Sequence, residues 1–333
     1  MRLHDIAVVG ASGLVGRKIL QVLNERKFEI GKIVPIASDS SVGKEIKVEG
    51  KQYKIQKLTP ETFKNIEFAF FSAGGAVSSE WAPIAAKEGC LVIDNSSAFR
   101  MKEDVPLVVP EVNRTDIFKN KGIIANPNCS TIQLVVALKP LDNAFKIRRI
   151  VVSTYQSVSG AGHKGVAALE NEITKTDNLV SRSPFPYQIA YNAIPQVDVF
   201  FDDGYTKEEL KMINETRKIM GKKDLNITAT CVRIPSLVGH GESVNIEFEK
   251  KVTVDEVKNV LISFKGIKVV DNLSNNLYPM PIDSVEKDDV FVGRIRTDNS
   301  VKNGINLWIV ADNVRKGAAT NAVQIAEEFL KGK

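Results

Sequence analysis

The sequence DIAVVGASGLVGRKIL, residues 5–20, joins an apolar run to a helical pattern through three glycines. The apolar run predicts a buried strand, and the helical spacing of apolar residues over 14–26 predicts an amphipathic helix after it. Gly10, Gly13 and Gly16 follow the order G-x-x-G-x-x-G, a variant of the G-x-G-x-x-G turn. Such a turn lets the backbone approach a pyrophosphate, which the positive end of the helix attracts. We therefore expect a dinucleotide site here rather than an ordinary strand-to-helix connection.

Strand-like runs alternate with helical patterns through the first half of the chain. Further strands are predicted at 31–38, 67–75, 90–97, 106–112 and 122–127, with helical segments starting at 59–63 and spanning 78–89 and a hairpin-like patch at 43–55. This alternation predicts a Rossmann-like, doubly wound parallel sheet. Ligands bind beyond the carboxyl ends of such strands. The segments expected there are Gly10–Gly16, Ser38–Ser41, Ser72–Gly75, Asn95–Arg100 and Asn126–Cys129.

The second half has longer strands with partial alternation, which predict an α+β domain of mixed sheet with helices on one face. The strands are predicted at 148–160, 226–235, 242–250, 290–298 and 306–312, and the helices at 164–173, 206–220 and 253–264. A last helix, 317–332, carries an apolar stripe that we expect to pack onto the first domain: Ala322, Ile325, Ala326 and Phe329. The predicted domains are 1–128, completed by 315–333, for the dinucleotide, and 129–314 for catalysis and dimerisation.

Composition indicates an ordinary globular protein. The 333 residues include 45 basic and 40 acidic side chains, a net charge of +5 that is too mild to indicate a nucleic-acid partner. We see neither a signal peptide nor an apolar run of membrane-spanning length, so we expect a cytoplasmic protein. Three widely spaced cysteines and three histidines predict neither a disulfide framework nor a metal site.

Cys129 lies in NPNCST, residues 126–131, at the predicted start of a helix. Pro127 disfavours helix for the residue before it, and Asn128 is a cap or near-cap. A helix N-terminus stabilises a thiolate, and its N–H groups can hold the oxyanion formed when the thiolate adds to a carbonyl. The local sequence therefore leaves open both a nucleophile and an ordinary buried thiol.

The remaining cysteines and the histidines decide little by themselves. Cys90 opens an apolar run and Cys231 lies inside a strand, so both fit buried thiols. His240, flanked by glycines in a predicted loop between two strands, is placed to reach a cleft and to serve a thiol nucleophile. His4 precedes the first strand and is expected at the surface, while spacing alone leaves His163 open as a partner.

The loop ASDSSVGK at 37–44 bears on the choice of dinucleotide. An NAD site usually has an acidic residue here that grips the ribose hydroxyls. Asp39 would do this and would repel a 2′-phosphate, whereas Lys44 and the serine hydroxyls would favour one. The serines are Ser38, Ser40 and Ser41. The balance favours NADP and leaves NAD open.

Seven motifs, in this order along the chain, resemble those of the aspartate-β-semialdehyde dehydrogenase family. They are GASGLVG (10–16), SSAFR (96–100), NPNCST (126–131), TYQSVSGAG (154–162), NETRKIM (214–220), CVRIP…GH (231–240) and ADNVRKGAA (311–319). The resemblance implies NADP-dependent reductive dephosphorylation of L-aspartyl-4-phosphate to L-aspartate-4-semialdehyde through a cysteine thioester. It also implies a homodimer and a role in lysine, diaminopimelate, threonine and methionine biosynthesis.

The resemblance assigns roles to individual residues. Cys129 matches the nucleophile, His240 the general acid/base, and Gln156 the glutamine that orients the substrate. The residues that match substrate contacts are Arg100 and Lys218 for phosphate, Arg233 for carboxylate, Glu215 for the amine and Asn128 for the acyl phosphate. The expected cofactor contacts are Gly10, Ser12, Gly13, Leu14, Val15, Ser38, Ser40, Ser41, Ser72, Gly74, Ser159, Gly160 and Asn313.

One position departs from the family pattern. The family usually carries an arginine that recognises the 2′-phosphate where this chain has Ser40, preceded by Asp39. Use of both NADP and NAD is therefore open. N-acetyl-glutamyl-phosphate reductase, a phosphorylating dehydrogenase of the glyceraldehyde-phosphate type, a Cys-His hydrolase and a non-catalytic dinucleotide sensor are the alternatives.

Overall fold

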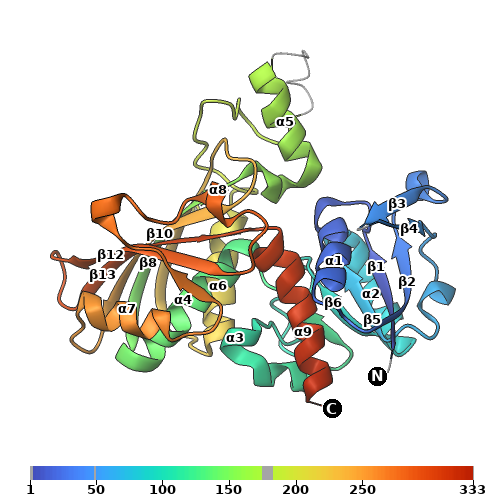
Figure 1. The fold of residues 1–333 in the computed structure, drawn as a ribbon, viewed down its shortest axis with the longest axis horizontal. Helices are drawn as coiled ribbons and strands as arrows, with labels where there is room; N and C mark the ends of the chain where they lie inside the picture. The colour runs from blue at the N-terminus through green and yellow to red at the C-terminus, as the bar shows by residue number, and fades with distance from the viewer. Residues whose placement is uncertain (1–2, 49, 175–182, 333) are drawn as a thin grey trace. The chain divides into compact units, whose positions relative to one another are not determined.

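The computed structural model of the chain describes residues 3–48, 50–174 and 183–332 (Figure 1). These residues form two compact units. The first comprises Met1–Asn128 and Ala318–Lys333, and the second comprises Cys129–Gly317. The chain passes from the first unit to the second between Asn128 and Cys129.

The first unit contains a five-stranded sheet in the order β2-β1-β5-β6-β7, with every adjacent pair parallel. The strands are β1 (His4–Val9), β2 (Ile30–Ile36), β5 (Phe68–Phe71), β6 (Leu91–Asp94) and β7 (Ile123–Ala125). The helices of this unit are α1 (Leu14–Glu25), α2 (Gly75–Lys87), α3 (Pro110–Asn113) and α9 (Thr320–Lys331). The prediction of a Rossmann-like parallel sheet is confirmed.

Helix α9 closes the core of this unit. Ala322, Ile325 and Ala326 are fully buried in the same apolar cluster as Ile6 of β1 and Ile19 of α1. Phe329 packs against the cluster from its edge. The expectation that the C-terminal helix packs onto the N-terminal part of the chain is therefore confirmed.

Two details of the first unit bear on the predicted elements. The hairpin expected within 43–55 forms as β3 (Glu45–Val48) and β4 (Lys51–Lys54), antiparallel, with Glu49 outside the described residues. The strand predicted at 106–112 is wrong, because only Leu107 makes a bridge, to Ala125, and Pro110 then begins α3. A proline has no N–H for a ladder, and its fixed φ suits the first turn of a helix.

The second unit is built on a six-stranded mixed sheet in the order β11-β12-β13-β10-β8-β9. Its strands are β8 (Ile147–Gln156), β9 (Asn226–Arg233), β10 (His240–Phe248), β11 (Ile267–Val269), β12 (Val290–Asp298) and β13 (Gly304–Ala311). Its helices are α4 (Cys129–Phe145), α5 (Gly162–Thr174), α6 (Lys207–Met220), α7 (Val254–Ile262) and α8 (Pro281–Ser284). Helices α4, α6 and α7 lie along one face of this sheet, as Figure 1 shows, which confirms the predicted α+β arrangement.

Helix α4 is the centre of the second unit. It extends to Phe145, beyond the end expected near Leu138, and passes through Pro140. Nearly every residue of it is buried, so the sequence has no polar face that would mark where the helix ends. This burial holds the N-terminal residue of the helix, Cys129, in one place.

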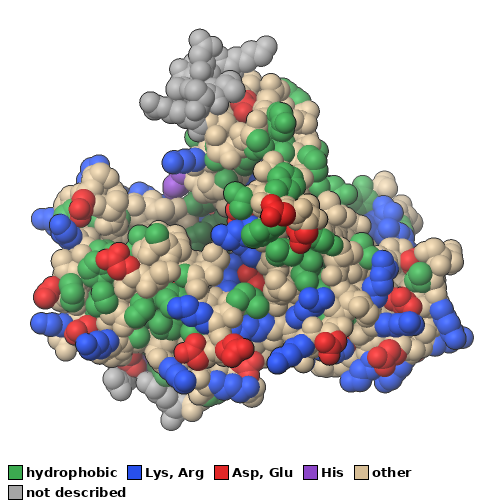
Figure 2. All heavy atoms as spheres, turned by 180° about the vertical axis from the view of Figure 1, so that it is seen from behind, with side chains coloured by type: hydrophobic (Ala, Val, Ile, Leu, Met, Phe, Trp, Pro, Cys, Tyr) green, Lys and Arg blue, Asp and Glu red, His purple; other side chains and the backbone are tan. Residues whose placement is uncertain are grey.

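The surface carries both signs of charge. Basic and acidic side chains are interspersed on the face in Figure 2, without a continuous field of one sign. Among the described residues, no helix combines the length and apolar character that a membrane crossing requires.

The glycine turn after β1 has the geometry that its sequence predicts. Gly10 has φ +88°, and a Cβ there would lie 2.3 Å from the carbonyl oxygen of Ser72. A Cβ at Gly16 would lie 2.2 Å from the carbonyl oxygen of Gly10. Gly13 is the N-cap of α1 and has no side chain to occupy the first N–H groups of the helix. The turn therefore presents bare backbone at the positive end of a helix.

We predict that Gly10→Ala is more destabilising than Gly74→Ala. Both glycines have φ near +88°, at +88° and +87°, but a Cβ at Gly74 would meet no atom within 4 Å. The matched pair therefore separates backbone strain, about 1 kcal/mol in each variant, from the clash at Gly10 alone. Urea unfolding of both variants is the measurement, and equal losses of unfolding free energy would contradict the steric argument.

Candidate active site

The predicted cofactor residues of the first unit gather at the carboxyl end of its sheet. Ser12, Leu14 and Val15 belong to the glycine turn and the first turn of α1, while Ser72 and Gly74 follow β5. The loop after β2 forms a short 3-10 turn, Asp39–Ser41. This is the edge at which parallel sheets bind ligands.

The loop after β2 is exposed and polar. The hydroxyls of Ser38 and Ser40 lie 3.1 Å apart. Asp39 Oδ1 lies 3.8 Å from Lys57 Nζ, a pair in which both side chains face solvent. Lys57 was not among the predicted site residues, because only the fold brings it to this loop.

Arg100 joins two loops at the same edge of the first sheet. Its Nη2 donates to the carbonyl oxygen of Asn95 at 2.7 Å and its Nε to that of Asn126 at 3.0 Å. Asn126 Nδ2 in turn donates to Asn95 Oδ1 at 3.0 Å. The predicted phosphate-binding arginine is therefore buried and fixed by the segments that lead to Asn128.

In the second unit, Cys129 and His240 lie together. Cys129 is the first residue of α4 and is partly exposed. His240, fully buried, is the first residue of β10 rather than part of a loop as predicted. The Cys129 Sγ lies 3.4 Å from His240 Nε2, within hydrogen-bond distance for sulfur. The two side chains are thus arranged as a nucleophile and its proton partner.

The other ring nitrogen of His240 faces the turn after β8. The backbone N–H of Ser157 donates to His240 Nδ1 at 3.0 Å, and Ser157 Oγ lies 3.0 Å from the same nitrogen. Burial and the nearby Arg233 lower the pKa of His240 to about 3, although Glu208 acts in the opposite direction. The neutral imidazole is therefore the stable form at neutral pH.

Ser159, Gly160 and Asn313 belong to this same cluster. Asn313 Nδ2 donates to Ser159 Oγ at 3.0 Å, and Asn313 Oδ1 accepts from Gly239 N–H at 2.9 Å. A Cβ on Gly160 would come within 2.7 Å of Arg233 Nη1. These residues therefore pack around the histidine and arginine of the second unit.

Arg233 is buried at the end of β9. Its Nη1 donates to the carbonyl oxygen of Ser157 at 2.6 Å, and its guanidinium lies 5.8 Å from the centre of the Phe185 ring. Burial lowers the pKa of Arg233, while Glu208 and Cys129 raise it. An arginine remains charged in such a place, so it presents a fixed cation beside Cys129.

Gln156 is held by a chain of buried polar groups. Its Nε2 donates to Glu208 Oε1 at 3.1 Å, and its Oε1 accepts from Thr154 Oγ1 at 3.0 Å. Glu208 Oε2 lies 3.0 Å from Lys211 Nζ, which also meets Asp198 at 2.8 Å. Burial alone would lower the pKa of Lys211, but the two carboxylates raise it. This network fixes the orientation of the Gln156 amide.

The remaining predicted substrate residues of this unit lie on α6. Glu215 is buried, and Lys218, one turn later, is partly exposed in the last turn of the helix. Gly317 packs against Cys129, since a Cβ on it would lie 2.9 Å from the Cβ of the cysteine.

Glu242 is a buried acid beneath the catalytic pair. It lies two residues after His240 on β10, and neither carboxyl oxygen has a hydrogen-bond partner among the described residues. Burial raises its pKa well above the ordinary value, and the nearby Gln133 only partly opposes this. Gln133 itself donates to the carbonyl oxygen of His240 at 3.4 Å. Glu242 is therefore protonated in the folded protein at neutral pH.

The other thiols and histidines have structural roles. Burial raises the pKa of Cys90 to about 12 and also raises the pKa of Cys231. His163 is exposed on α5. His4, expected at the surface, is buried instead, because it pairs with Glu67 and packs edge-on against Phe28 and Phe68.

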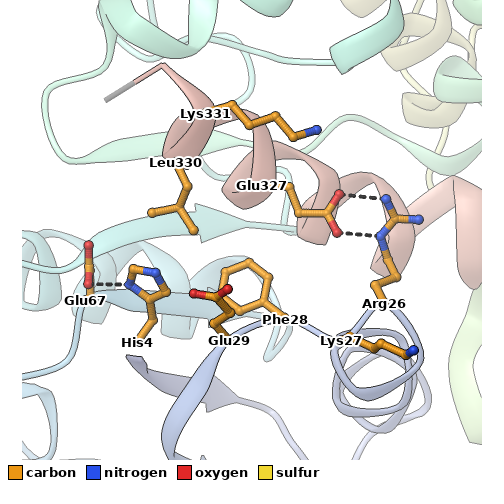
Figure 3. Close-up of a pocket in the computed structure, with 9 residues that line it drawn as sticks. All are labelled: His4, Arg26, Lys27, Phe28, Glu29, Glu67, Glu327, Leu330 and Lys331. Carbon is orange, nitrogen blue, oxygen red and sulfur yellow. Dashed lines mark hydrogen bonds and ion pairs between the residues drawn. The ribbon is translucent and has the colours of Figure 1, made fainter. Parts of the chain in front are cut away.

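A large pocket of the first unit lies elsewhere. Its volume is about 680 Å³, and it lies where β1 begins and where α1 and α9 end (Figure 3). Two ion pairs occupy its walls, Arg26 with Glu327 at 2.6 Å and His4 with Glu67 at 2.7 Å. Because this is the opposite end of β1 from the glycine turn, it is not the predicted dinucleotide site. Within the described chain, no cluster of three or more His, Cys, Asp or Glu side chains is suited to a metal.

Sequence reasoning missed several residues of the site. Ser157 and Glu208 stand beside motifs that were singled out, so the motif TYQS and the acidic start of α6 are the signals that carried them. Glu242 and Lys211 had no such signal. Their importance depends on burial and on partners from other elements.

The fold and the site together define a class: a two-unit enzyme with a dinucleotide-binding parallel sheet and a catalytic unit that carries a cysteine-histidine pair. Comparisons with known families agree. The model of the semialdehyde dehydrogenase NAD binding domain matches residues 5–120, and that of the semialdehyde dehydrogenase dimerisation domain matches residues 138–316.

Relatives cover the whole chain. It is 56% identical to aspartate-semialdehyde dehydrogenase of Aquifex aeolicus over 335 residues, with 98% of each chain covered. It is 50% identical to that of Bacillus subtilis, with 98% and 97% covered. A crystal structure of aspartate semialdehyde dehydrogenase II from Vibrio cholerae complexed with ASA has a TM-score of 0.94 at 46% identity, with 99% of each chain covered. That of the Candida albicans enzyme with NADP has a TM-score of 0.78 at 25% identity, with 99% of each chain covered.

This chain belongs to the aspartate-semialdehyde dehydrogenase family. The resemblance seen in the seven motifs is thereby confirmed, and the alternative enzymes are not favoured.

We predict that Glu208→Gln lowers kcat about tenfold or more, because a neutral amide holds Gln156 less firmly and leaves Lys211 with Asp198 alone. The adjacent Glu209→Gln is the control. Glu209 is also buried but caps α6 through Thr206, so its loss costs stability while kcat stays near that of the wild type. Steady-state kinetics and urea unfolding measure both variants, and equal losses of kcat would contradict a role for Glu208 in the site.

We predict that Glu242→Gln stabilises the protein increasingly as pH rises. The folded-state pKa of Glu242 lies above its unfolded value, so the wild type loses stability above the unfolded pKa, by about 1.4 kcal/mol per pH unit at most. The amide does not ionise and is free of this loss. Urea unfolding of both proteins at pH 5 and pH 8 is the measurement, and a difference independent of pH would show that Glu242 is not buried as an acid.

Proposed function

We propose that this chain interconverts L-aspartyl-4-phosphate and L-aspartate-4-semialdehyde, with NADP as the preferred dinucleotide. The observation that carries the proposal is the 3.4 Å separation of Cys129 Sγ and His240 Nε2 in a chain of this family. The reaction serves the biosynthesis of lysine through diaminopimelate, and of threonine and methionine.

The residues of the glycine turn fit a dinucleotide, because the backbone approach they permit would be filled by any Cβ at Gly10 or Gly16. When bound, the dinucleotide would supply the hydride that reduces the substrate carbon. Ser12 to Val15 would hold its pyrophosphate, and the Ser38 and Ser40 hydroxyls its ribose or 2′-phosphate. Asp39, lying 3.8 Å from the Lys57 ammonium, repels a 2′-phosphate less than an isolated carboxylate would, which supports NADP with NAD as a second cofactor.

Cys129 would act as the nucleophile. Its thiolate attacks the acyl phosphate, expels phosphate and holds the substrate as a thioester. The first turn of α4 and the buried guanidinium of Arg233 both stabilise the negative charge on sulfur. A serine would serve less well, because an oxyester accepts hydride less readily and an alkoxide leaves less easily.

The charges of the substrate match the proposed contacts. Arg233 would hold the carboxylate with two parallel N–H donors, and Glu215 would meet the ammonium group. Arg100 and Lys218 would bind phosphate, while Asn128 and Gln156 would align the acyl group. The buried settings of Arg100, Arg233 and Glu215 support these roles, because buried charged groups are costly without a partner.

The proposed assembly is a homodimer in the cytoplasm. The family model matched over 138–316 is a dimerisation domain, and the sheet face opposite α4 presents Tyr155 and Trp308, whose rings are 5.4 Å apart. Three unpaired cysteines suit a reducing compartment.

The test is a spectrophotometric assay of dinucleotide reduction with L-aspartate-4-semialdehyde and phosphate, run with NADP and then with NAD. We expect Cys129→Ala to lose at least about 1,000-fold in kcat, because the covalent route needs the thiol. Cys90→Ala is the matched control, since Cys90 is a buried structural thiol, and we expect it to stay active. Activity with N-acetyl-glutamate semialdehyde in place of the aspartyl substrate, or an active Cys129→Ala variant, would refute the proposal.

A further inference from the structure

The hydrogen bond between Ser157 and His240 determines where the imidazole keeps its proton. The donor is a backbone N–H, 3.0 Å from His240 Nδ1, and a backbone N–H has no lone pair with which to accept. Nδ1 must therefore be the unprotonated nitrogen of the ring. The Ser157 hydroxyl, also 3.0 Å away, can either donate or accept, so it is the backbone group that settles the tautomer.

The single ring proton then lies on Nε2, which faces sulfur. Nε2 is 3.4 Å from Cys129 Sγ, so its N–H points toward the thiolate as a donor. A second proton on the ring would place an N–H of His240 against the N–H of Ser157. An imidazolium paired with a thiolate, the usual arrangement of Cys-His nucleophiles, is thus opposed by a fixed donor of the main chain.

Asn313 holds the Ser157 segment in register with the histidine. Asn313 Oδ1 accepts from the N–H of Gly239, the residue before His240, at 2.9 Å and from Ser157 Oγ at 3.1 Å. One amide oxygen therefore ties the turn after β8 to the start of β10. Because Gly239 N–H can only donate, the orientation of the Asn313 amide is determined as well.

The charged groups around His240 do not favour a second proton. Cys129 on α4 and Glu208 on α6 favour a cationic ring, whereas Arg233 on β9 opposes it. Glu242, on the same strand, is neutral at physiological pH. Full burial adds to the effect of Arg233, since a desolvated imidazolium is costly.

We propose that His240 works as a neutral imidazole with its proton on Nε2, with Ser157 as the positioning residue that fixes this tautomer and Asn313 as the residue that anchors Ser157. The chemical consequence rests on the proposed function. The Cys129 thiol loses its proton to solvent, not to the histidine. The thiolate forms a C–S bond with the carbonyl carbon, and the electron pair moves to oxygen. When the C=O bond re-forms, phosphate leaves with the C–O electron pair and takes its proton from water.

His240 then acts a second time as a hydrogen-bond donor. Once the thioester carbon has been reduced, its oxyanion accepts from the Nε2–H. The C=O bond re-forms as the C–S electron pair returns to sulfur, and the aldehyde leaves. No proton departs from His240 in either step, so the ring acts as an electrophile of the kind known for neutral catalytic histidines.

The direct test is ¹⁵N NMR of the protein labelled at histidine, in which long-range correlations report the protonation of each ring nitrogen. With three histidines in the chain, variants of His4 and His163 assign the signals. We expect His240 to show a protonated Nε2 and an unprotonated Nδ1 from pH 5 to pH 8. An imidazolium in this range, or a proton on Nδ1, overturns the proposal. Exposed His163 is the internal control.

Two variants separate the backbone donor from the hydroxyl of Ser157. Ser157→Ala keeps the N–H, so we expect the Nε2–H tautomer to persist. Asn313→Ala removes the anchor, and we expect the ring signals of His240 to broaden with a lower kcat and little change in KM. A change of tautomer in Ser157→Ala would show that the hydroxyl is decisive and would overturn the assignment to the backbone.

Alkylation of Cys129 by iodoacetamide as a function of pH is the second test. We expect a single ionisation in the wild type and, in His240→Asn, the same profile displaced by less than one pH unit. A reactive plateau at pH 5 that falls more than tenfold in His240→Asn would reveal an imidazolium–thiolate pair and overturn the proposal. Cys129→Ala supplies the blank. Neither readout uses the aspartyl substrate, so failure of the proposed function would leave both tests valid.

Discussion

The hydrogen bond from the Ser157 backbone to His240 links the two strand ends on which the catalytic unit depends. Strand β8 is antiparallel to β10 and parallel to β9, a register that sets Gln156 opposite Arg233 and Tyr155 opposite Gly241. A shift of one residue would turn these side chains to the other face of the sheet. The bond therefore reports that the register is correct, and it fixes the nitrogen that faces the nucleophile.

Helix α4 supplies the other half of the pair at a cost in solvation. Its burial holds Cys129 at one position, but the surrounding core also encloses Glu208, Arg233 and Glu242. Glu208 and Arg233 are stabilised by partners, whereas Glu242 remains neutral because the interior offers it none. The site is thus rigid because charged groups are buried in a network whose members orient one another.

Cofactor binding follows a different physical rule. At the glycine turn, close approach of the backbone is a steric matter, since Gly10 and Gly16 have no room for a Cβ. The loop that bears on the 2′-phosphate is exposed, and its Asp39–Lys57 pair is screened by water and salt. Binding of a dinucleotide is therefore strictly determined by shape, while the preference between NADP and NAD depends on weak, adjustable charges.

The sequence by itself determined the parallel sheet, the mixed sheet, the glycine turn and the position of Cys129 at a helix start, because each depends on local periodicity or on the backbone properties of Gly and Pro. It did not locate the end of α4, the burial of His4 or the start of β10 at His240. Only the tertiary structure brought Ser157 to His240, 83 residues away, and to Asn313, 156 residues away. The physical reason is that strand register and burial select the partner of a hydrogen bond, and no local pattern encodes either.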